Sequence, residues 1–434
     1  MRLTEVKDYV KNYKFLNIVI ALAYVYFYDF IYCNYVCALF HETYIPLDVN
    51  DYILLGVTGS FPIFFYKGLK EIASVFSIFT YILAFIPFNE TLAVGGFGSA
   101  YLDYRILFIV SMCIFFTTDS FSIKSNLFAR KSKWSFLQFR RFVYLILVVV
   151  VLLNITNLHL TNFMNSRDVL YDLRANLKVV GGTPVVYLIY WLKNALLPIL
   201  LVCALQRKEY LHVLFAFLGC LCMYMIDQQK ITFLAPFAIL MLFLLYKRNN
   251  IMLRNYYHII IMLTLIIVPF LCFFYKDISD TAYEIAAILI YRTQCIEGQE
   301  LNTYLNFFGH DGTHPYTYYS HIGIINALTG MYPYGNMALG HAVTEGGSNA
   351  NGMFWLMDGI AAGGFYGCAF IGIVFVFVKS FFNGIKQKCD VELFAVISLF
   401  AMSMTMNVSL FTALLSCGLL LFYFLFLYVD FDLK

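Results

Sequence analysis

Long apolar segments, separated by short polar ones, run along nearly the whole chain. Each has roughly 17–25 residues, enough for an α-helix to cross the hydrocarbon core of a bilayer. We therefore predict an all-α, polytopic membrane protein with about twelve membrane-spanning helices. They are expected near residues 15–39, 51–67, 72–88, 104–119, 141–158, 184–204, 211–227, 231–246, 256–275, 353–378, 391–407 and 409–428.

Basic residues mark one side of the membrane. Of the 29 Lys and Arg residues, 21 lie at the chain ends or in alternate loops between these segments. Because cytoplasmic loops are enriched in Lys and Arg, we predict that both termini are cytoplasmic. Residues 1–434 then form one membrane domain with two long outer segments, an amphipathic loop at 157–183 and a large cap loop at 276–352.

The composition agrees with this class. Hydrophobic residues make up 61% of the 434 residues and charged residues 13%, with a mean hydropathy of +0.75, far from the balance of a soluble domain. Most of the eleven cysteines lie inside apolar segments, and no His, Cys or acidic cluster has the spacing of a metal site. We expect no disulfide framework, no metal, no cofactor and no nucleic-acid partner.

The amphipathic loop carries basic residues in a regular pattern. Arg167, Tyr171, Arg174 and Lys178 are spaced 4, 3 and 4 apart, which places them on one face of a predicted helix. Two interpretations stay open. The helix could lie at the interface with its basic face on lipid headgroups, or its guanidinium groups could bind a diphosphate bidentately.

Further cations lie on or near the predicted outer side, where the orientation rule disfavours them. Lys193 is inside a predicted span, where a charge is either functional or extended to the interface. Lys230 ends the turn that begins at Asp227, and it either closes this turn or contacts a ligand. Arg292 is expected at the end of a helix with a capping box at Thr281 and Glu284.

The cap loop is long and rich in aromatic residues, which favours a folded functional element over a disordered linker. A short helix over about 320–328 would carry His321. This residue and His341 flank a tyrosine-rich centre, and with Glu345 they are candidates for a general base. The tyrosines that would offer apolar ring faces to sugars are Tyr316, Tyr318 and Tyr319.

The start of the tenth predicted span combines polar residues with glycines. Asn351, Trp355 and Asp358 share one helical face. Asp358 is an acid inside the membrane, so it is either functional or paired with an Arg or Lys. Glycines recur every fourth residue at Gly359, Gly363 and Gly367, a pattern that allows close helix packing.

Taken together, these features resemble the Wzy-type polymerases of O-antigen and capsule repeat units. The features are the loop with Arg167 and Arg174, the Asp227–Lys230 turn, the large cap loop, and the run from Asn349 through Asp358 into the glycines. The resemblance covers most of the chain as topology. The Arg-x10-Gly spacing of some members is absent, and the His-Asn pair of the related ligases is replaced by Asn349-Ala350-Asn351.

The resemblance implies the C-type glycosyltransferase fold of polymerases and ligases, in the bacterial inner membrane with the active face outward. The substrates would be a growing glycan and a new repeat unit, both on undecaprenyl diphosphate, and a chain-length regulator protein is a candidate partner. The implied catalytic candidates are His321, Asp358, His341 and Glu345. The implied diphosphate ligands are Arg167, Arg174, Lys178, Lys230 and Arg292. The implied sugar contacts are Tyr316, Tyr318, Tyr319, Trp355 and Asn351.

Two alternatives stay open. The first is an O-antigen ligase or another lipid-linked-sugar glycosyltransferase. Members of the latter class often have a catalytic acid in the first outer loop, where His41, Glu42, Asp48 and Asp51 lie. A polysaccharide flippase or transporter would also have about twelve spans. The chain halves show no repeat, and a cap loop of 77 residues (276 to 352) is atypical of transporters.

Overall fold

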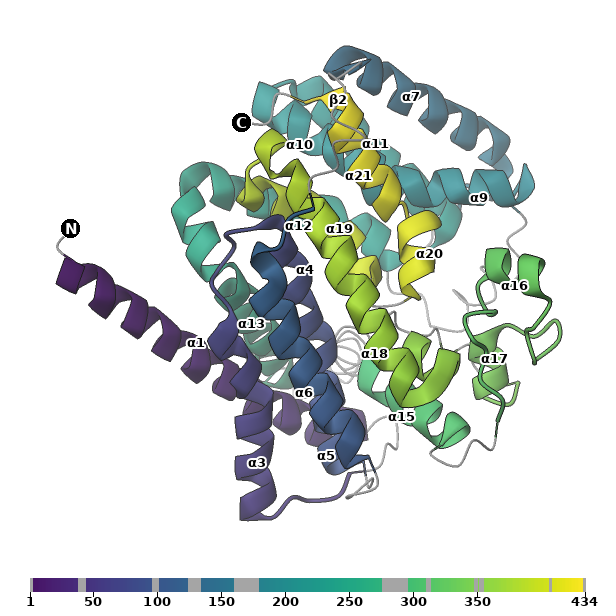
Figure 1. Cartoon of the computed structure of the whole chain (residues 1–434). Coiled ribbons are helices and arrows are strands. Elements are labelled where there is room, and N and C mark those ends of the chain that lie inside the picture. The colour runs from purple at the N-terminus through teal and green to yellow at the C-terminus, as the bar shows by residue number, and fades with distance from the viewer. Residues whose placement is uncertain are drawn as a thin grey trace. The chain divides into compact units, whose positions relative to one another are not determined.

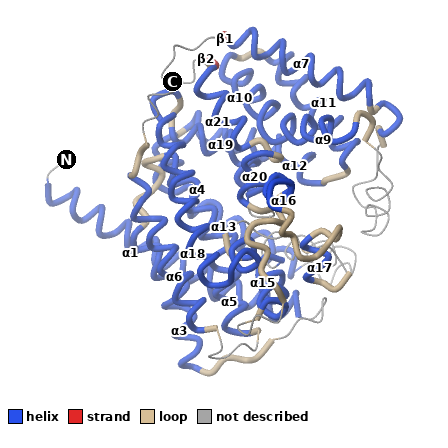
Figure 2. Tube along the Cα trace, turned by 45° about the vertical axis from the view of Figure 1, so that its right-hand side comes forward, coloured by secondary structure: helices blue, strands red, loops and turns tan. Residues whose placement is uncertain are grey.

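The computed structural model describes residues 3–37, 44–95, 101–123, 134–159, 179–274, 296–309, 314–346, 350, 355–405 and 408–431. These residues are mainly helical (Figures 1 and 2), and two-residue strands β1 (Trp134–Ser135) and β2 (Val429–Asp430) pair in parallel. Helices satisfy their backbone hydrogen bonds internally, as a lipid environment requires. The prediction of an all-α polytopic membrane protein is confirmed as a class, without the number of spans or the fold.

Nine helices in the described part of the chain are long and apolar enough to cross a membrane. They coincide with nine of the predicted spans. The other three predicted spans coincide with shorter helices, namely α3 (Val49–Ser60) continued by η2 (Phe61–Phe65), α6 (Leu102–Thr117) and α19 (Val391–Thr405). A helix of 16 residues such as α6 rises about 24 Å, less than the roughly 30 Å of a bilayer core. The count of twelve therefore stays a prediction, as does the orientation.

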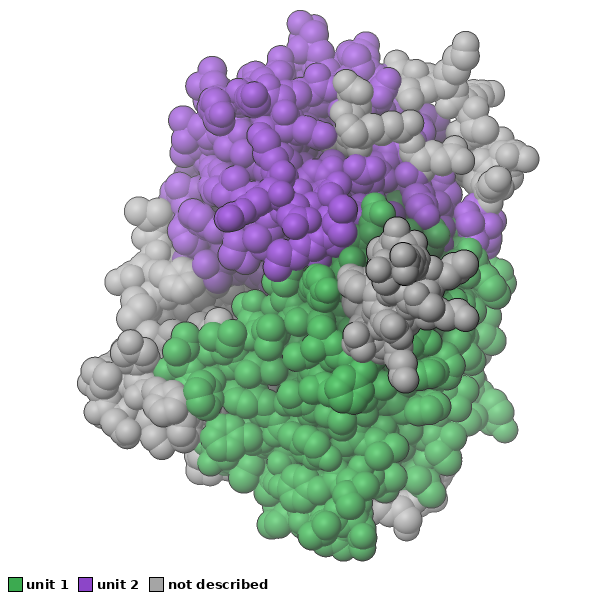
Figure 3. Space-filling model, turned by 90° about the vertical axis from the view of Figure 1, so that its left-hand side faces the viewer, with its two compact units in different colours: residues 1–121, 254–380, 406–410 green, residues 122–253, 381–405, 411–434 purple. Residues whose placement is uncertain are grey.

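The chain divides into two compact units, coloured separately in Figure 3. The first comprises residues 1–121, 254–380 and 406–410, and the second residues 122–253, 381–405 and 411–434. Besides α3, η2 and α6, the first unit contains α1 (Leu3–Ile31), η1 (Tyr32–Cys37), α4 (Ile72–Thr80), η3 (Tyr81–Phe85), α5 (Ile86–Val94), η4 (Thr118–Ser120), most of α13 (Asn250–Phe274), α15 (Ile296–Phe308), α16 (Gly323–Thr329), α17 (Leu339–Val343) and most of α18 (Met357–Phe382).

The second unit contains the strand pair and the remaining helices. Besides α19, these are α7 (Phe136–Leu153), η6 (Ile155–Asn157), α9 (Gly182–Trp191), η7 (Leu192–Leu196), α10 (Leu197–Arg207), α11 (Tyr210–Asp227), α12 (Lys230–Arg248), η9 (Asn383–Lys388), most of α20 (Leu410–Leu415) and α21 (Leu419–Tyr428). Its core is α10, which packs against α7, α11, α12 and α19.

Two buried helices contain a wide π-helical turn just before a proline. In η3 the N–H of Ile86 bonds to the carbonyl of Tyr81, five residues back, and Pro87 follows. The same arrangement occurs in η7, ahead of Pro198. Proline has no N–H and its ring crowds the carbonyl four residues earlier. The wider turn relieves that crowding, and such turns are frequent at functional sites.

The described part of the cap loop consists of short helices joined by turns. The helix predicted over about 320–328 is present as α16, but it begins at Gly323, so His321 precedes the helix and does not lie on it. Helix α15 packs against α5, where a Cβ on Gly298 would meet the carbonyl of Pro87 at 3.1 Å. The helices predicted in the amphipathic loop and over Thr281–Arg292 lie outside the described residues.

Candidate functional site

Helix α18 is interrupted a few residues after it begins. The backbone of Gly364 has φ 60° and ψ −136°, and Gly363 next to it has φ −179° and ψ 33°, so neither is helical. At this break the chain turns, and Gly359 faces Cys368 so closely that a Cβ would lie 2.6 Å from the Cys368 nitrogen. The glycines thus allow the two arms of α18 to pack on each other. This agrees with the predicted close helix packing, and the packing partner is the other arm of α18.

The break leaves two carbonyl groups without their helical donors, and the cap loop supplies replacements. The N–H of Thr317 donates to the carbonyl of Ala361 at 2.8 Å, and its hydroxyl donates to the same oxygen at 3.0 Å. The N–H of Tyr318 donates to the carbonyl of Ala362 at 3.1 Å. Irregular backbone at membrane depth requires such partners. The break therefore fixes the cap loop against α18.

His321 and Asp358 meet beside this break. His321 Nε2 donates to Asp358 Oδ1 at 2.6 Å, and the two side chains are only 8% and 1% exposed. The second oxygen, Asp358 Oδ2, is buried and forms no hydrogen bond of normal geometry with any described residue, although the Leu410 N–H approaches the carboxylate. The described partner of Asp358 is thus a histidine, not the arginine or lysine of the alternative interpretation.

Thr317 completes this pair, which we call the dyad, on the other side of the ring. Its single hydroxyl hydrogen has two acceptors, His321 Nδ1 at 2.7 Å and the Ala361 carbonyl at 3.0 Å. When the Thr317 hydroxyl donates to Nδ1, that nitrogen has no hydrogen of its own and the imidazole is neutral. When the hydroxyl turns to Ala361, Nδ1 can take up a proton, and the imidazolium then donates to Thr317 and to Asp358. In either protonation state, both ring nitrogens therefore have a hydrogen-bond partner, as a general base requires.

The turn that presents His321 is built from strained residues. Tyr318 and Tyr319 have φ 47° and 64°, a left-handed conformation that costs about 1–3 kcal/mol per bulky residue and is found mostly at functional sites. Tyr318 is 65% exposed, and Tyr319 donates to the Gly367 carbonyl at 3.3 Å. Burial raises the pKa of Tyr316 and of Tyr319. Both hydroxyls therefore stay protonated at neutral pH. The Tyr319 hydrogen goes to Gly367, so of the two hydroxyls only that of Tyr316 could donate to a sugar.

Four further residues predicted for catalysis or sugar contact are Trp355, His341, Glu345 and Asn351. The ring of Trp355 is 1% exposed and packs edge-on against Phe115 at 4.9 Å, so it presents no face to a sugar in this structure. His341 lies on the short helix α17 and Glu345 follows it in an exposed turn with φ 52°. Asn351 lies outside the described residues.

Most of the predicted diphosphate ligands, Arg167, Arg174, Lys178 and Arg292, also lie outside the described residues. Lys230 begins α12. In the turn before it, Asp227 accepts a hydrogen bond from Lys193 Nζ at 2.6 Å, and Gln229 Oε1 accepts another at 2.8 Å. The Lys193 side chain is 1% exposed. Lys193 is therefore the cation that holds this turn, neither extended to the interface nor free for a ligand.

A second buried ion pair lies in the first unit. Lys379 Nζ is fully buried and donates to Asp119 Oδ1 at 2.8 Å, to Ser77 Oγ at 3.1 Å and to the carbonyl of Phe115. Lys379 is one of the 21 basic residues on the predicted cytoplasmic side. Its burial shows that this charge serves packing between helices, because a buried ammonium needs such partners.

Of the acids predicted for an alternative site in the first outer loop, Asp48 has a structural role. Its Oδ1 accepts a hydrogen bond from the N–H of Asp51 at 2.8 Å and caps α3. His41 and Glu42 lie outside the described residues. Among the described residues, no group of three or more His, Cys, Asp or Glu could hold a metal ion.

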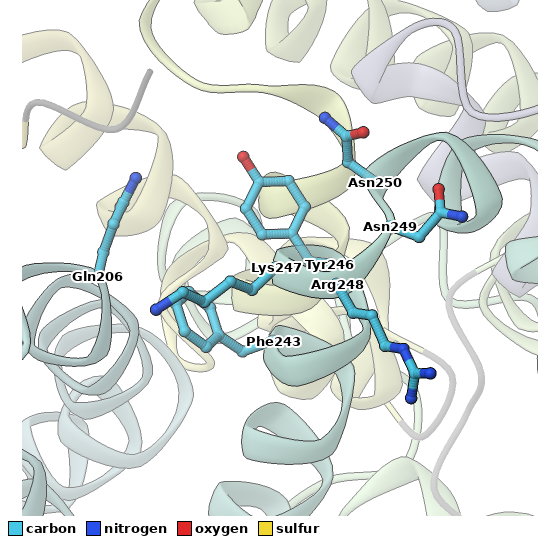
Figure 4. Close-up of a pocket in the computed structure, with 7 residues that line it drawn as sticks. All are labelled: Gln206, Phe243, Tyr246, Lys247, Arg248, Asn249 and Asn250. Atoms are coloured by element: carbon cyan, nitrogen blue, oxygen red, sulfur yellow. The ribbon is translucent and has the colours of Figure 1, made fainter.

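One pocket of about 410 Å³ lies in the second unit, at the end of α12 (Figure 4). Its lining residues are Gln206, Phe243, Tyr246, Lys247, Arg248, Asn249 and Asn250. The side chains of Lys247 and Arg248 point in opposite directions, so they do not converge on one anion. The pocket contains none of the predicted site residues.

Comparison with known proteins gives no relative: no protein-family model, curated protein or solved structure matches the chain.

Sequence reasoning named His321 and Asp358 separately and missed Thr317. The only signal for Thr317 was its position four residues before His321.

Proposed function

We propose that the chain is a membrane glycosyltransferase that polymerises oligosaccharide repeat units carried on a lipid diphosphate. The observation that carries the proposal is the buried dyad of His321 and Asp358 at the break of α18, next to the tyrosines of the cap loop. A base oriented by a carboxylate suits the activation of a sugar hydroxyl. Broken membrane helices are typical of sites that bind a substrate within the membrane.

In the proposed reaction, a hydroxyl oxygen of the acceptor unit attacks the anomeric carbon of the donor glycan. The bond from that carbon to the lipid diphosphate breaks, and the diphosphate leaves with the electron pair. The hydroxyl proton passes to His321 Nδ1 as the Thr317 hydroxyl turns to Ala361. Asp358 stabilises the imidazolium, and the basic residues Arg167, Arg174, Lys178, Lys230 and Arg292 are proposed to neutralise the departing diphosphate.

The lipid would be undecaprenyl diphosphate, and the protein would lie in the bacterial inner membrane with both termini in the cytoplasm and the dyad toward the outer face. A chain-length regulator is the proposed protein partner. These points derive from the resemblance to Wzy-type polymerases and from the distribution of basic residues along the chain.

The test is transfer by purified protein in lipid nanodiscs, supplied with a lipid-diphosphate-linked repeat unit. A ladder of products differing by one unit is expected. A single addition would indicate a ligase or another lipid-linked-sugar transferase, and no transfer would contradict the proposal. The matched control is the same glycan on a lipid monophosphate, a poorer leaving group that should give little product.

A further inference from the structure

The first unit contains a buried carboxylate that no described residue satisfies by a hydrogen bond. Glu90 of α5 is 0% exposed, and neither of its carboxylate oxygens has a hydrogen-bond partner among the described residues. The carboxyl group of Asp29, on α1 and 6% exposed, lies within hydrogen-bonding reach of it. Two carboxylates have no hydrogen between them to share, and two buried like charges in contact are strongly unfavourable. This arrangement requires an occupant.

The neighbouring groups satisfy Asp29 but not Glu90. Tyr44 OH donates to Asp29 Oδ1 and Tyr52 OH to Asp29 Oδ2, each at 3.1 Å. Arg105 of α6 acts on Glu90 through its charge, while its own Nε donates to Asn89 Oδ1 at 3.1 Å and its Nη2 to Thr58. Two carboxylates and one guanidinium leave one negative charge in excess.

The other titratable groups that the structure describes around the pair do not remove this excess. Asp51 of α3 adds a further negative charge near Arg105, and Cys33 of η1 lies close to Asp29. Helix α15, which packs on α5, carries two more acids, Glu297 and Glu300. None of these groups is a second cation.

We propose that Asp29 and Glu90 bind one proton between them, as a carboxyl–carboxylate pair in which Glu90 O–H donates to Asp29. A proton needs only the two facing oxygens. A metal ion would need a shell of several oxygen ligands, whereas the Asp29 oxygens already accept from Tyr44 and Tyr52. The adjacent guanidinium of Arg105 would also repel a metal ion.

The bound proton joins three helices to the cap loop. It connects α1 to α5, and Tyr52 extends the contact to α3. Helix α5 also holds α15, because Gly298 of α15 packs against Pro87, three residues before Glu90. Loss of the proton would place two negative charges between α1 and α5. This inference is independent of the proposed function.

Infrared spectroscopy of the purified protein in nanodiscs tests the proton directly. At neutral pH the wild-type protein should show the C=O band of a protonated carboxyl group, shifted in D₂O and absent in Glu90→Gln. The control Asp51→Asn removes an exposed carboxylate of the same region and should leave the band intact. A Glu90→Gln difference spectrum that shows the loss of an ionised carboxylate would overturn the proposal.

The pH dependence of unfolding supplies a second measurement. One proton held only in the folded state makes the folding equilibrium constant fall as the pH rises, by at most tenfold per pH unit. In Glu90→Gln this dependence should disappear while the fold persists, because the amide can donate to Asp29. If Glu90→Gln does not fold, Asp29→Asn, whose amide can donate to Glu90, should show the same loss. An unchanged pH dependence in the variant that folds would overturn the proposal.

Discussion

Replacement of Gly364 by alanine should destabilise the protein by straightening or straining the break of α18. Its φ of 60° with ψ of −136° is a conformation that side chains other than glycine rarely adopt. A Cβ would also lie 2.7 Å from the Tyr316 hydroxyl and 3.3 Å from that of Tyr104. Backbone strain of this kind costs about 1–3 kcal/mol, and displacing the flexible Tyr316 adds about 1 kcal/mol. We expect a free energy of unfolding lower by roughly 2–4 kcal/mol.

The assay is denaturant unfolding in detergent, followed by tryptophan fluorescence, to which the buried Trp355 contributes. Gly372→Ala is the matched control, since it lies on the same helix and its Cβ would meet its nearest atom, Trp355 Nε1, at an ordinary 3.5 Å. That variant should be unchanged or more stable by up to about 1 kcal/mol, as the helix propensity of alanine predicts. Equal effects of the two substitutions would refute the break of α18 as a strained turn.

Three further outcomes are expected. Lys193→Met should lower the free energy of unfolding by about 3–5 kcal/mol, because it leaves Asp227 without its cation. A double variant that also removes the Asp227 charge should recover part of this loss. No recovery would argue against the ion pair. A cysteine at Thr313 should react with an impermeant reagent from outside the cell and one at Ser132 should not, whereas the reverse would invert the predicted orientation. Arg167→Ala should greatly reduce polymer yield and Arg167→Lys restore only part of it, because a point charge does not replace a bidentate guanidinium; normal yield in both variants would exclude this arginine from the diphosphate site.

The membrane class and most spans could be predicted from the sequence because twenty-residue apolarity is a local property. The dyad could not. His321 and Asp358 are 37 residues apart, and their contact depends on left-handed turns at Tyr318 and Tyr319 and on the break at Gly364. Tyrosines carry no sequence signal for a left-handed turn, and a glycine every fourth residue equally fits a straight packed helix.

Two charged sites were within reach of sequence reasoning. Asp29 and Glu90 lie in or beside long apolar segments, where an acid is functional or paired, and this rule identifies both without showing that they meet. Lys193 was recognised as a charge inside a span. Its partner Asp227 was noted only as a neighbour of Lys230, since an antiparallel contact between α11 and the η7 region is a tertiary feature that residue spacing does not reveal.

The most direct test of the dyad is the turnover of a lipid-diphosphate-linked repeat unit by His321→Ala and Asp358→Asn, with substrate binding measured in parallel. Removal of the base should lower turnover by roughly 10²–10⁴-fold while the substrate still binds. His341→Ala is the matched histidine control and should remain near normal, and Thr317→Val, which frees Nδ1, should stay within about tenfold. Near-normal turnover in both His321→Ala and Asp358→Asn would contradict a catalytic role for the dyad.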